Sequence, residues 1–180
     1  MSEKVTHFVW CALVAVEIAR SDGRVQTQEE ERNFIMKWLQ QAQKKRLFCR
    51  EVAPVLLALQ KLNNLYGVSI SIREILNYYW QLDTGSLRKQ TDFYRLHCAL
   101  TFIKLPEAQK IFLPKHKQFM EIFIDNETLL RVFDDSGNLI MPLMIKVEFN
   151  ISLIRLIFRK CSFYCAIHEE KKMIALSSGV

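Results

Sequence analysis

Glycine and proline are scarce in this sequence, with 5 and 4 copies among 180 residues. No low-complexity tract and no repeat of fixed period is present, which excludes a disordered linker, a collagen-like chain and a solenoid. Half of the residues are apolar, enough for a substantial core in one domain or two small ones. The composition is therefore that of a compact folded protein.

Long apolar runs are also missing. The longest, Phe8 to Val16, spans nine residues, whereas a helix that crosses a bilayer needs roughly 20. The first residues, which include Glu3 and Lys4, lack the basic start of a signal peptide. We therefore expect a soluble cytoplasmic protein without a membrane span.

The sequence lacks the short motifs that carry a known catalytic mechanism. It has no phosphate-binding or dinucleotide glycine loop, no His-Glu-x-x-His, no Gly-x-Ser-x-Gly and no Cys-x-x-Cys. His97 and Cys98 are adjacent, so on a helix they point in different directions. Cysteines are odd in number and mostly lie in apolar sequence, which is typical of buried thiols: Cys11, Cys49, Cys98, Cys161 and Cys165. We expect a protein without enzymatic activity and without a cofactor.

Five helices are predicted in the first two thirds of the chain. The first covers Val5 to Ala19, which is apolar on nearly every side and indicates a central helix. Thr27 and Glu30 have the spacing of a capping box, and Ser71 with Glu74 repeats it. Pro54 is compatible with the first turn of a helix, and Gly67 is typical of a helix end. Thr91 or Asp92 is typical of a helix start. The predicted helices are 5–19, 28–43, 51–64, 72–80 and 92–105.

The pattern changes after Pro114. Three stretches are rich in β-branched and aromatic residues and are separated by turn-like sequence: Phe119 to Ile124, Thr128 to Phe133 and Leu139 to Phe149. Ile151 to Ile167 is apolar on both faces and fits either a buried helix or a pair of strands, of which we favour strands. These features predict an α+β fold with a five-helix bundle over residues 1–113 and an antiparallel β-meander over residues 114–180.

The net charge of +6 is concentrated in the first part of the chain. Up to Leu113 there are 16 basic and 11 acidic residues, and after it 9 and 8. Basic side chains near Tyr78, Tyr79 and Trp80 could hold single-stranded nucleic acid by stacking and charge. The candidate residues are Lys44, Lys45, Arg46, Arg88 and Lys89. Basic side chains near a helix C-terminus also complement the helix dipole, and the aromatics also fit a core.

An acidic turn joins the first two predicted helices. With Asp22 as position 1, it fails as an EF-hand loop, because Thr27 stands where glycine is needed and Asn33 where a glutamate is needed. A less regular divalent-metal site formed by Asp22, Glu29 and Glu30 remains open. The same residues also fit turn and capping roles.

The segment Val5 to Ala42 resembles the TerB-like, tellurite-resistance-associated helical domain. The resemblance rests on an apolar helix, the turn Asp22-Gly23, the hydrophobic Val25, and Glu29 or Glu30 opening the next helix. It implies an all-helical bundle as the alternative fold. It also implies a stress-response protein that binds metal through Asp22, Glu29 and Glu30. The second Asp-Gly turn of the family is missing here.

Together these observations favour a protein-interaction or adaptor protein that acts through helix grooves or an exposed β-edge. The apolar faces of 151–167 and an unpaired strand edge make self-association as a homodimer plausible. The alternatives are a nucleic-acid-binding module that uses the basic N-terminal part, and a metal-binding stress protein of the TerB-like kind.

Overall fold

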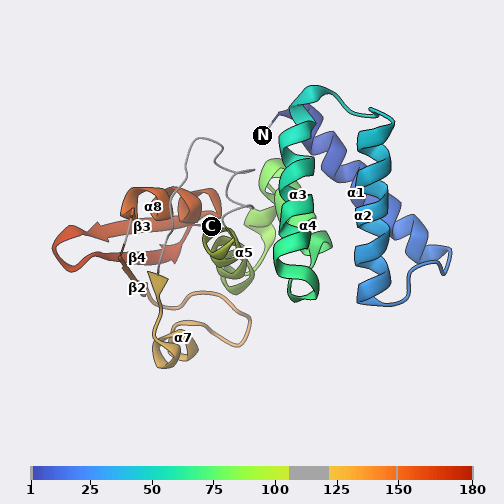
Figure 1. The fold of residues 1–180 in the computed structure, drawn as a ribbon. Coiled ribbons are helices and arrows are strands. Elements are labelled where there is room, and N and C mark those ends of the chain that lie inside the picture. The colour runs from blue at the N-terminus through green and yellow to red at the C-terminus, as the bar shows by residue number, and fades with distance from the viewer. Residues whose placement is uncertain (1, 106–121, 149, 180) are drawn as a thin grey trace. The chain divides into compact units, whose positions relative to one another are not determined.

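The computed structural model describes residues 2–105, 122–148 and 150–179, and they divide into two compact units. Of these residues, 2–84 form the first unit and the remainder form the second (Figure 1). The predicted boundary at residue 113 lies outside the described residues. None of the described helices is long and apolar enough to span a bilayer.

The first unit consists of four α-helices and two short 3₁₀ turns. They are α1 (Glu3–Ser21), α2 (Gln28–Lys44), η1 (Arg50–Val52), α3 (Ala53–Tyr66), η2 (Gly67–Ser69) and α4 (Ile72–Thr84). α1 packs against α2 and α4, and α2 also packs against α3. These four helices confirm the predicted helices of this region to within a few residues at each end.

α1 buries a stripe of residues at helical spacing, including Phe8, Ala12 and Val16. It is not buried all round, because the side chains of Trp10 and Ile18 are 45% and 52% exposed. The expectation of a central, fully surrounded helix is therefore wrong. The apolar residues of this helix outnumber the positions that its neighbours cover.

The helix starts and ends follow the predicted local signals. The Thr27 hydroxyl accepts a hydrogen bond from the Glu30 N–H at 3.2 Å, and the Glu30 carboxylate accepts from the Thr27 N–H at 3.0 Å. The capping box is therefore complete. Gly67 follows α3 with a φ of 54°, a left-handed conformation that a side chain would strain.

The second unit is a mixed layer of helices and strands. It contains η3 (Ser86–Lys89), α5 (Asp92–Lys104), β1 (Ile122–Phe123), α7 (Asn126–Val132), β2 (Leu143–Val147), α8 (Ile151–Lys160), β3 (Phe163–His168), η4 (Glu169–Lys171) and β4 (Met173–Ser178). The fifth predicted helix is therefore present as α5, but it belongs to this unit and not to the bundle. The described residues hold seven α-helices instead of five, and the fold is α+β.

The four strands form one antiparallel sheet in the order β1-β2-β4-β3. β4 pairs with β2 on one side and with β3 on the other, so β2 and β3 run parallel. The connection between them contains α8, which packs on β3 and β4 (Figure 1). The sheet is therefore a split β-α-β arrangement and not the predicted meander. The presence of a four-stranded sheet also contradicts the alternative prediction of an all-helical fold.

Two predicted strands are helices. Thr128 to Phe133 lies largely in α7, because the Asp125 side chain caps this helix by accepting from the Thr128 N–H at 2.9 Å. The first ten residues of Ile151 to Ile167 form α8, and the strand prediction is correct only from Phe163 onward. Predicted strands 119–124 and 139–149 shrink to β1 and β2, and residues 119–121 and 149 lie outside the described residues.

The core of the second unit lies between the sheet and α8. The buried strand residues alternate, as half-covered strands require, and α8 contributes a helical stripe. Ile145 of β2 stands opposite Ile174 of β4, and Leu143 stands opposite Leu176. The buried residues of this core include Leu143, Ile145, Val147, Ile154, Ile157, Phe158, Ile174 and Leu176.

A buried ion pair fixes α5 to the rest of this unit. Asp92 and Arg95 are 2% and 1% exposed and pair with each other. The other Asp92 oxygen accepts from the Leu139 N–H at 2.8 Å, and the Arg95 guanidinium donates to the Ser162 carbonyl at 2.7 Å and to the Ser178 hydroxyl at 3.3 Å. Two buried charges thus connect four segments of the chain.

We expect Thr27→Ala to lower the free energy of unfolding of the full chain by about 1 kcal/mol, because the Glu30 N–H loses its acceptor. Thr27→Ser keeps the oxygen and is the control. Urea denaturation followed by circular dichroism measures the difference. Equal stability of the alanine and serine variants would contradict the capping role.

Replacing Arg95 by methionine should destabilise the second unit by about 3–5 kcal/mol, because the Asp92 carboxylate is then buried without its cation. Adding Asp92→Asn removes that charge while keeping an acceptor for the Leu139 N–H. The double variant should regain part of the loss in urea denaturation. A single variant within about 0.5 kcal/mol of the wild type, the usual range of surface substitutions, would show that the pair does not stabilise the unit.

Candidate functional site

Two of the three acidic residues suspected of metal binding have local partners of their own. Asp22 forms an ion pair with Arg24 at 2.6 Å, and Glu30 is folded back onto the backbone of Gln26 and Thr27. These two N–H groups hold the pKa of Glu30 below its ordinary value. Glu29 lines a cleft between the starts of α2 and α4. Metal binding by Asp22, Glu29 and Glu30 stays a prediction.

That cleft has a volume of about 300 Å³, and two of its lining residues, Glu31 and Arg73, belong to a charged network that was not predicted from the sequence. Glu31 is buried and lies 2.5 Å from Arg20 and 3.9 Å from Arg73. Arg73 also pairs with Glu17. The network ties α1, α2 and α4 together, so both arginines are already neutralised by carboxylates. Over residues 2–105, 122–148 and 150–179, no group of three His, Cys, Asp or Glu side chains could hold a metal ion.

The suspected nucleic-acid-binding residues fall in different units. Lys44, Lys45 and Arg46 are exposed around the end of α2, whereas Arg88 and Lys89 are exposed in η3 of the second unit. Two of the three aromatic residues expected to stack on bases, Tyr78 and Tyr79, are buried in the core of the bundle, whereas Trp80 is half-buried. Nucleic-acid binding stays a prediction that rests on charge alone.

A cysteine–histidine pair that was not predicted from the sequence lies on α1. His7 and Cys11 lie one turn apart on α1, and the Nε2 and Sγ atoms are 3.5 Å apart. The spacing of four residues was the available signal. Burial raises the pKa of the Cys11 thiol, which disfavours the thiolate form.

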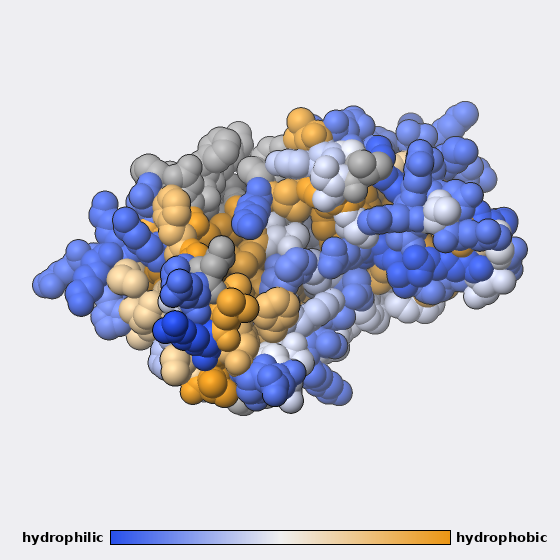
Figure 2. All heavy atoms as spheres, turned by 90° about the horizontal axis from the view of Figure 1, so that it is seen from below, coloured by the Kyte–Doolittle hydropathy of each residue, from blue (hydrophilic) through white to orange (hydrophobic). Residues whose placement is uncertain are grey.

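The most distinctive surface feature is an apolar patch on the second unit, formed by Phe93, Leu130, Ile140 and Met141. Their side chains are 51%, 84%, 61% and 51% exposed. Figure 2 shows apolar side chains gathered on the face of this unit that carries α7 and the segment leading into β2. We refer to these four residues as the α7 patch.

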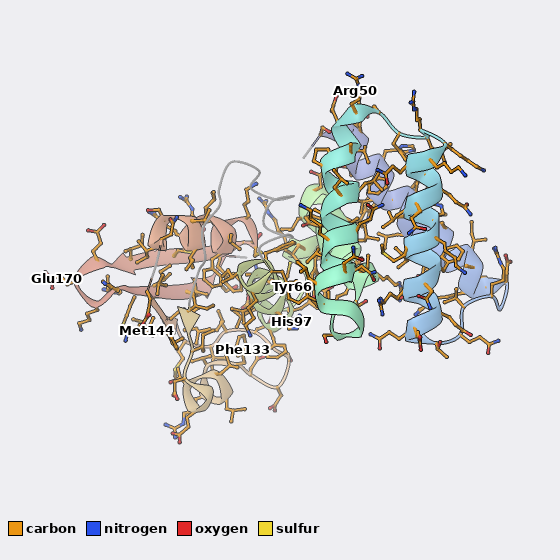
Figure 3. All side chains as sticks on the ribbon, viewed as in Figure 1. Arg50, Tyr66, His97, Phe133, Met144 and Glu170 are labelled. Atoms are coloured by element: carbon orange, nitrogen blue, oxygen red, sulfur yellow. The ribbon has the colours of Figure 1, made fainter. Side chains whose placement is uncertain are left out.

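Hydrogen bonds and ring contacts fix the α7 patch in place. The Ile140 N–H donates to the Val132 carbonyl at the end of α7, at 2.9 Å. The Phe93 N–H donates to the Gly137 carbonyl at 2.9 Å, and the ring of Phe93 contacts that of Phe133 at 5.5 Å between centroids. Phe133, labelled in Figure 3, thus links α7 to the start of α5. The patch is a formed surface and not a loose loop.

The patch was missed because Leu130, Ile140 and Met141 were assigned to predicted strands, while Phe93 was assigned to the fifth predicted helix. The local signal was present, since Asp125 three residues before Thr128 is a typical helix N-cap and Glu127 favours a first turn. A seven-residue helix at this point presents Leu130 to solvent, whereas a strand would have placed it in a sheet.

The sheet also has an exposed side. Alternation places Met144 and Lys146 of β2 on the face opposite the core, in line with Ala175 and Met173 of β4. β3 pairs with β4 alone among the strands that the structure describes, and its Tyr164 is 70% exposed. A β-edge of the predicted kind is therefore present beside this face.

Comparisons of the chain with family models, curated proteins and solved structures gave no match. The resemblance to the TerB-like domain thus rests on the local sequence of α1, the Asp22-Gly23 turn and α2. Within that stretch, Val25 is buried and Gly23 has a φ of 71°.

We expect Cys165 to react slowly with iodoacetamide at pH 7.5, because burial raises the pKa of its thiol to about 11. At that pKa, less than about 0.1% of the thiol is ionised, and the thiolate is the nucleophile. Cys49 is exposed and should react first. Peptide mass spectrometry after timed quenching gives the order, and Cys49→Ser should remove the fast phase. Labelling of Cys165 ahead of Cys49 would contradict this order.

Proposed function

We propose that this protein is a non-enzymatic interaction protein that recruits a partner protein through the α7 patch. The observation that carries the proposal is the exposure of four large apolar side chains on two segments of the second unit, the start of α5 and residues 130–141, which a backbone hydrogen bond and a ring contact connect. Monomeric proteins rarely expose contiguous apolar groups of this kind unless the surface serves binding.

The way the patch is built supports a binding role. Val132, Leu143 and Ile145 are fully buried directly beside exposed Leu130 and Met141. The exposed residues therefore stand on a packed core, which keeps their positions fixed before a partner arrives. Such pre-organisation reduces the conformational entropy lost on association.

Aromatic and methionine side chains suit this use. Methionine adapts its shape to a partner, and aromatic rings bury a large area with few rotatable bonds. Each fully buried side chain of this size contributes roughly 1.5–3 kcal/mol by area. Two or three such residues are enough to dominate an interface of modest size.

Combining Leu130→Ser with Met141→Ser should reduce partner capture at least tenfold, because truncating two central apolar contacts costs about 1 kcal/mol or more each. In-cell cross-linking followed by quantitative mass spectrometry measures the captured set. The matched control is Leu57→Ser with Leu65→Ser, two leucines of α3 that are 48% and 66% exposed.

The same samples are measured by light scattering, which reports any homodimer and its dependence on the patch. Capture that is lost in the patch variant and kept in the control supports the proposal. Capture that is equal in the two variants would show that binding uses another surface.

A further inference from the structure

The segment that carries three of the four α7-patch residues has a net charge opposite in sign to that of the whole chain. Residues 122–142 contain four carboxylates, Asp125, Glu127, Asp134 and Asp135, against one cation, Arg131, which gives −3. The whole chain carries +6. Leu130, Ile140 and Met141 therefore lie on an acidic segment of a basic protein, whereas Phe93 follows the exposed Arg88 and Lys89 in the sequence.

Two of these carboxylates are held in position by the backbone. Asp125 accepts from the Thr128 N–H and hydroxyl, and Asp134 accepts from the Ser136 and Asn138 N–H groups at 3.0 and 2.8 Å. The bonds to Thr128 also hold the pKa of Asp125 below its ordinary value. Hydrogen bonds therefore fix both carboxylates on the segment that carries the patch.

The other two carboxylates are open to solvent. Asp135 is exposed, and Glu127 has an 82% exposed side chain that lies 3.8 Å from the equally exposed Arg131. Exposed pairs of this kind are weak, so Glu127 remains free to meet a partner's charge. Fixed and free negative charges therefore border the same apolar surface.

Resting on the proposed function, we propose that the α7 patch binds a cationic amphipathic segment of another protein. Apolar side chains of the partner contact Leu130, Ile140 and Met141, while its Lys or Arg side chains face the four carboxylates. Charge complementarity sets the choice of partner and the association rate, and the apolar contacts set most of the affinity. Anionic lipid surfaces and nucleic acids are disfavoured because the same carboxylates repel phosphate.

The probe is a fluorescent peptide of about 18 residues, or about five helical turns, built from Leu and Lys at helical spacing. Its counterpart replaces every Lys by Glu. Titration with the full-length protein is followed by fluorescence anisotropy at low and high salt. We expect the Leu/Lys peptide to bind at least tenfold more tightly than the Leu/Glu peptide, with weaker binding as salt rises.

Charge variants test the mechanism. Glu127→Gln with Asp135→Asn removes two negative charges and leaves the backbone hydrogen bonds of Asp125 and Asp134 intact. It should weaken binding of the Leu/Lys peptide three- to tenfold. The control, Glu169→Gln with Glu170→Gln, removes two carboxylates from η4, where Figure 3 shows Glu170 at the tip of the β3–β4 hairpin. The control should bind as the wild type does.

Each other outcome has a defined meaning. Equal affinity for both peptides, lost in Leu130→Ser with Met141→Ser, would overturn the charge selection and leave the apolar interaction surface standing. Failure to bind either peptide would overturn the inference that the partner is a cationic segment. The cross-linking comparison of the patch variant and its control tests the proposed function separately. Patch-dependent binding to phosphatidylglycerol vesicles would assign the patch to membranes and overturn the inference as well.

Discussion

The Asp92–Arg95 ion pair is the interaction on which the second unit depends. Both residues lie on α5. They form hydrogen bonds with the Leu139 N–H in the segment after α7, with the Ser162 carbonyl in the turn after α8 and with the Ser178 hydroxyl at the end of β4. The Arg95 guanidinium also lies 5.0 Å from the centre of the Phe163 ring. Because a buried charge tolerates few arrangements, this pair selects one packing of α5 against the sheet and thereby places Phe93 on the surface.

The helical part of the fold could be predicted because its signals are local. Thr27 with Glu30, Ser71 with Glu74, Thr91, and Gly67 each define a helix start or end within a few residues of sequence. The sheet could not be predicted in the same way. Its order depends on β4 entering between β2 and β3, which is a contact between distant segments and leaves no short pattern. α7 and α8 were wrongly predicted as strands because both contain β-branched residues, which favour strands. Each of these segments follows a helix N-cap, Asp125 or Asn150, and the cap outweighed the strand preference of the residues after it.

The candidate surface was harder to predict than the fold. Exposed Leu130 and buried Val132 are both apolar, and sequence alone does not distinguish an apolar residue that faces solvent from one that faces a core. Asp22 and Glu30, which were predicted to bind metal, have local structural roles, whereas Glu127 and Asp135 of the candidate surface lie in stretches that were predicted only as turns. Tyr78 and Tyr79 show the reverse case, since aromatic residues suspected of binding are buried core residues.

The place of β4 in the sheet links this fold to the order of its synthesis. Of the four described strands, β4 comes last in sequence, yet it lies between β2 and β3 and supplies hydrogen bonds to both. During translation, β2, α8 and β3 leave the ribosome before the strand that unites them. The sheet therefore cannot close co-translationally until β4 emerges, and until then the apolar stripe of α8 is a surface that a chaperone could recognise.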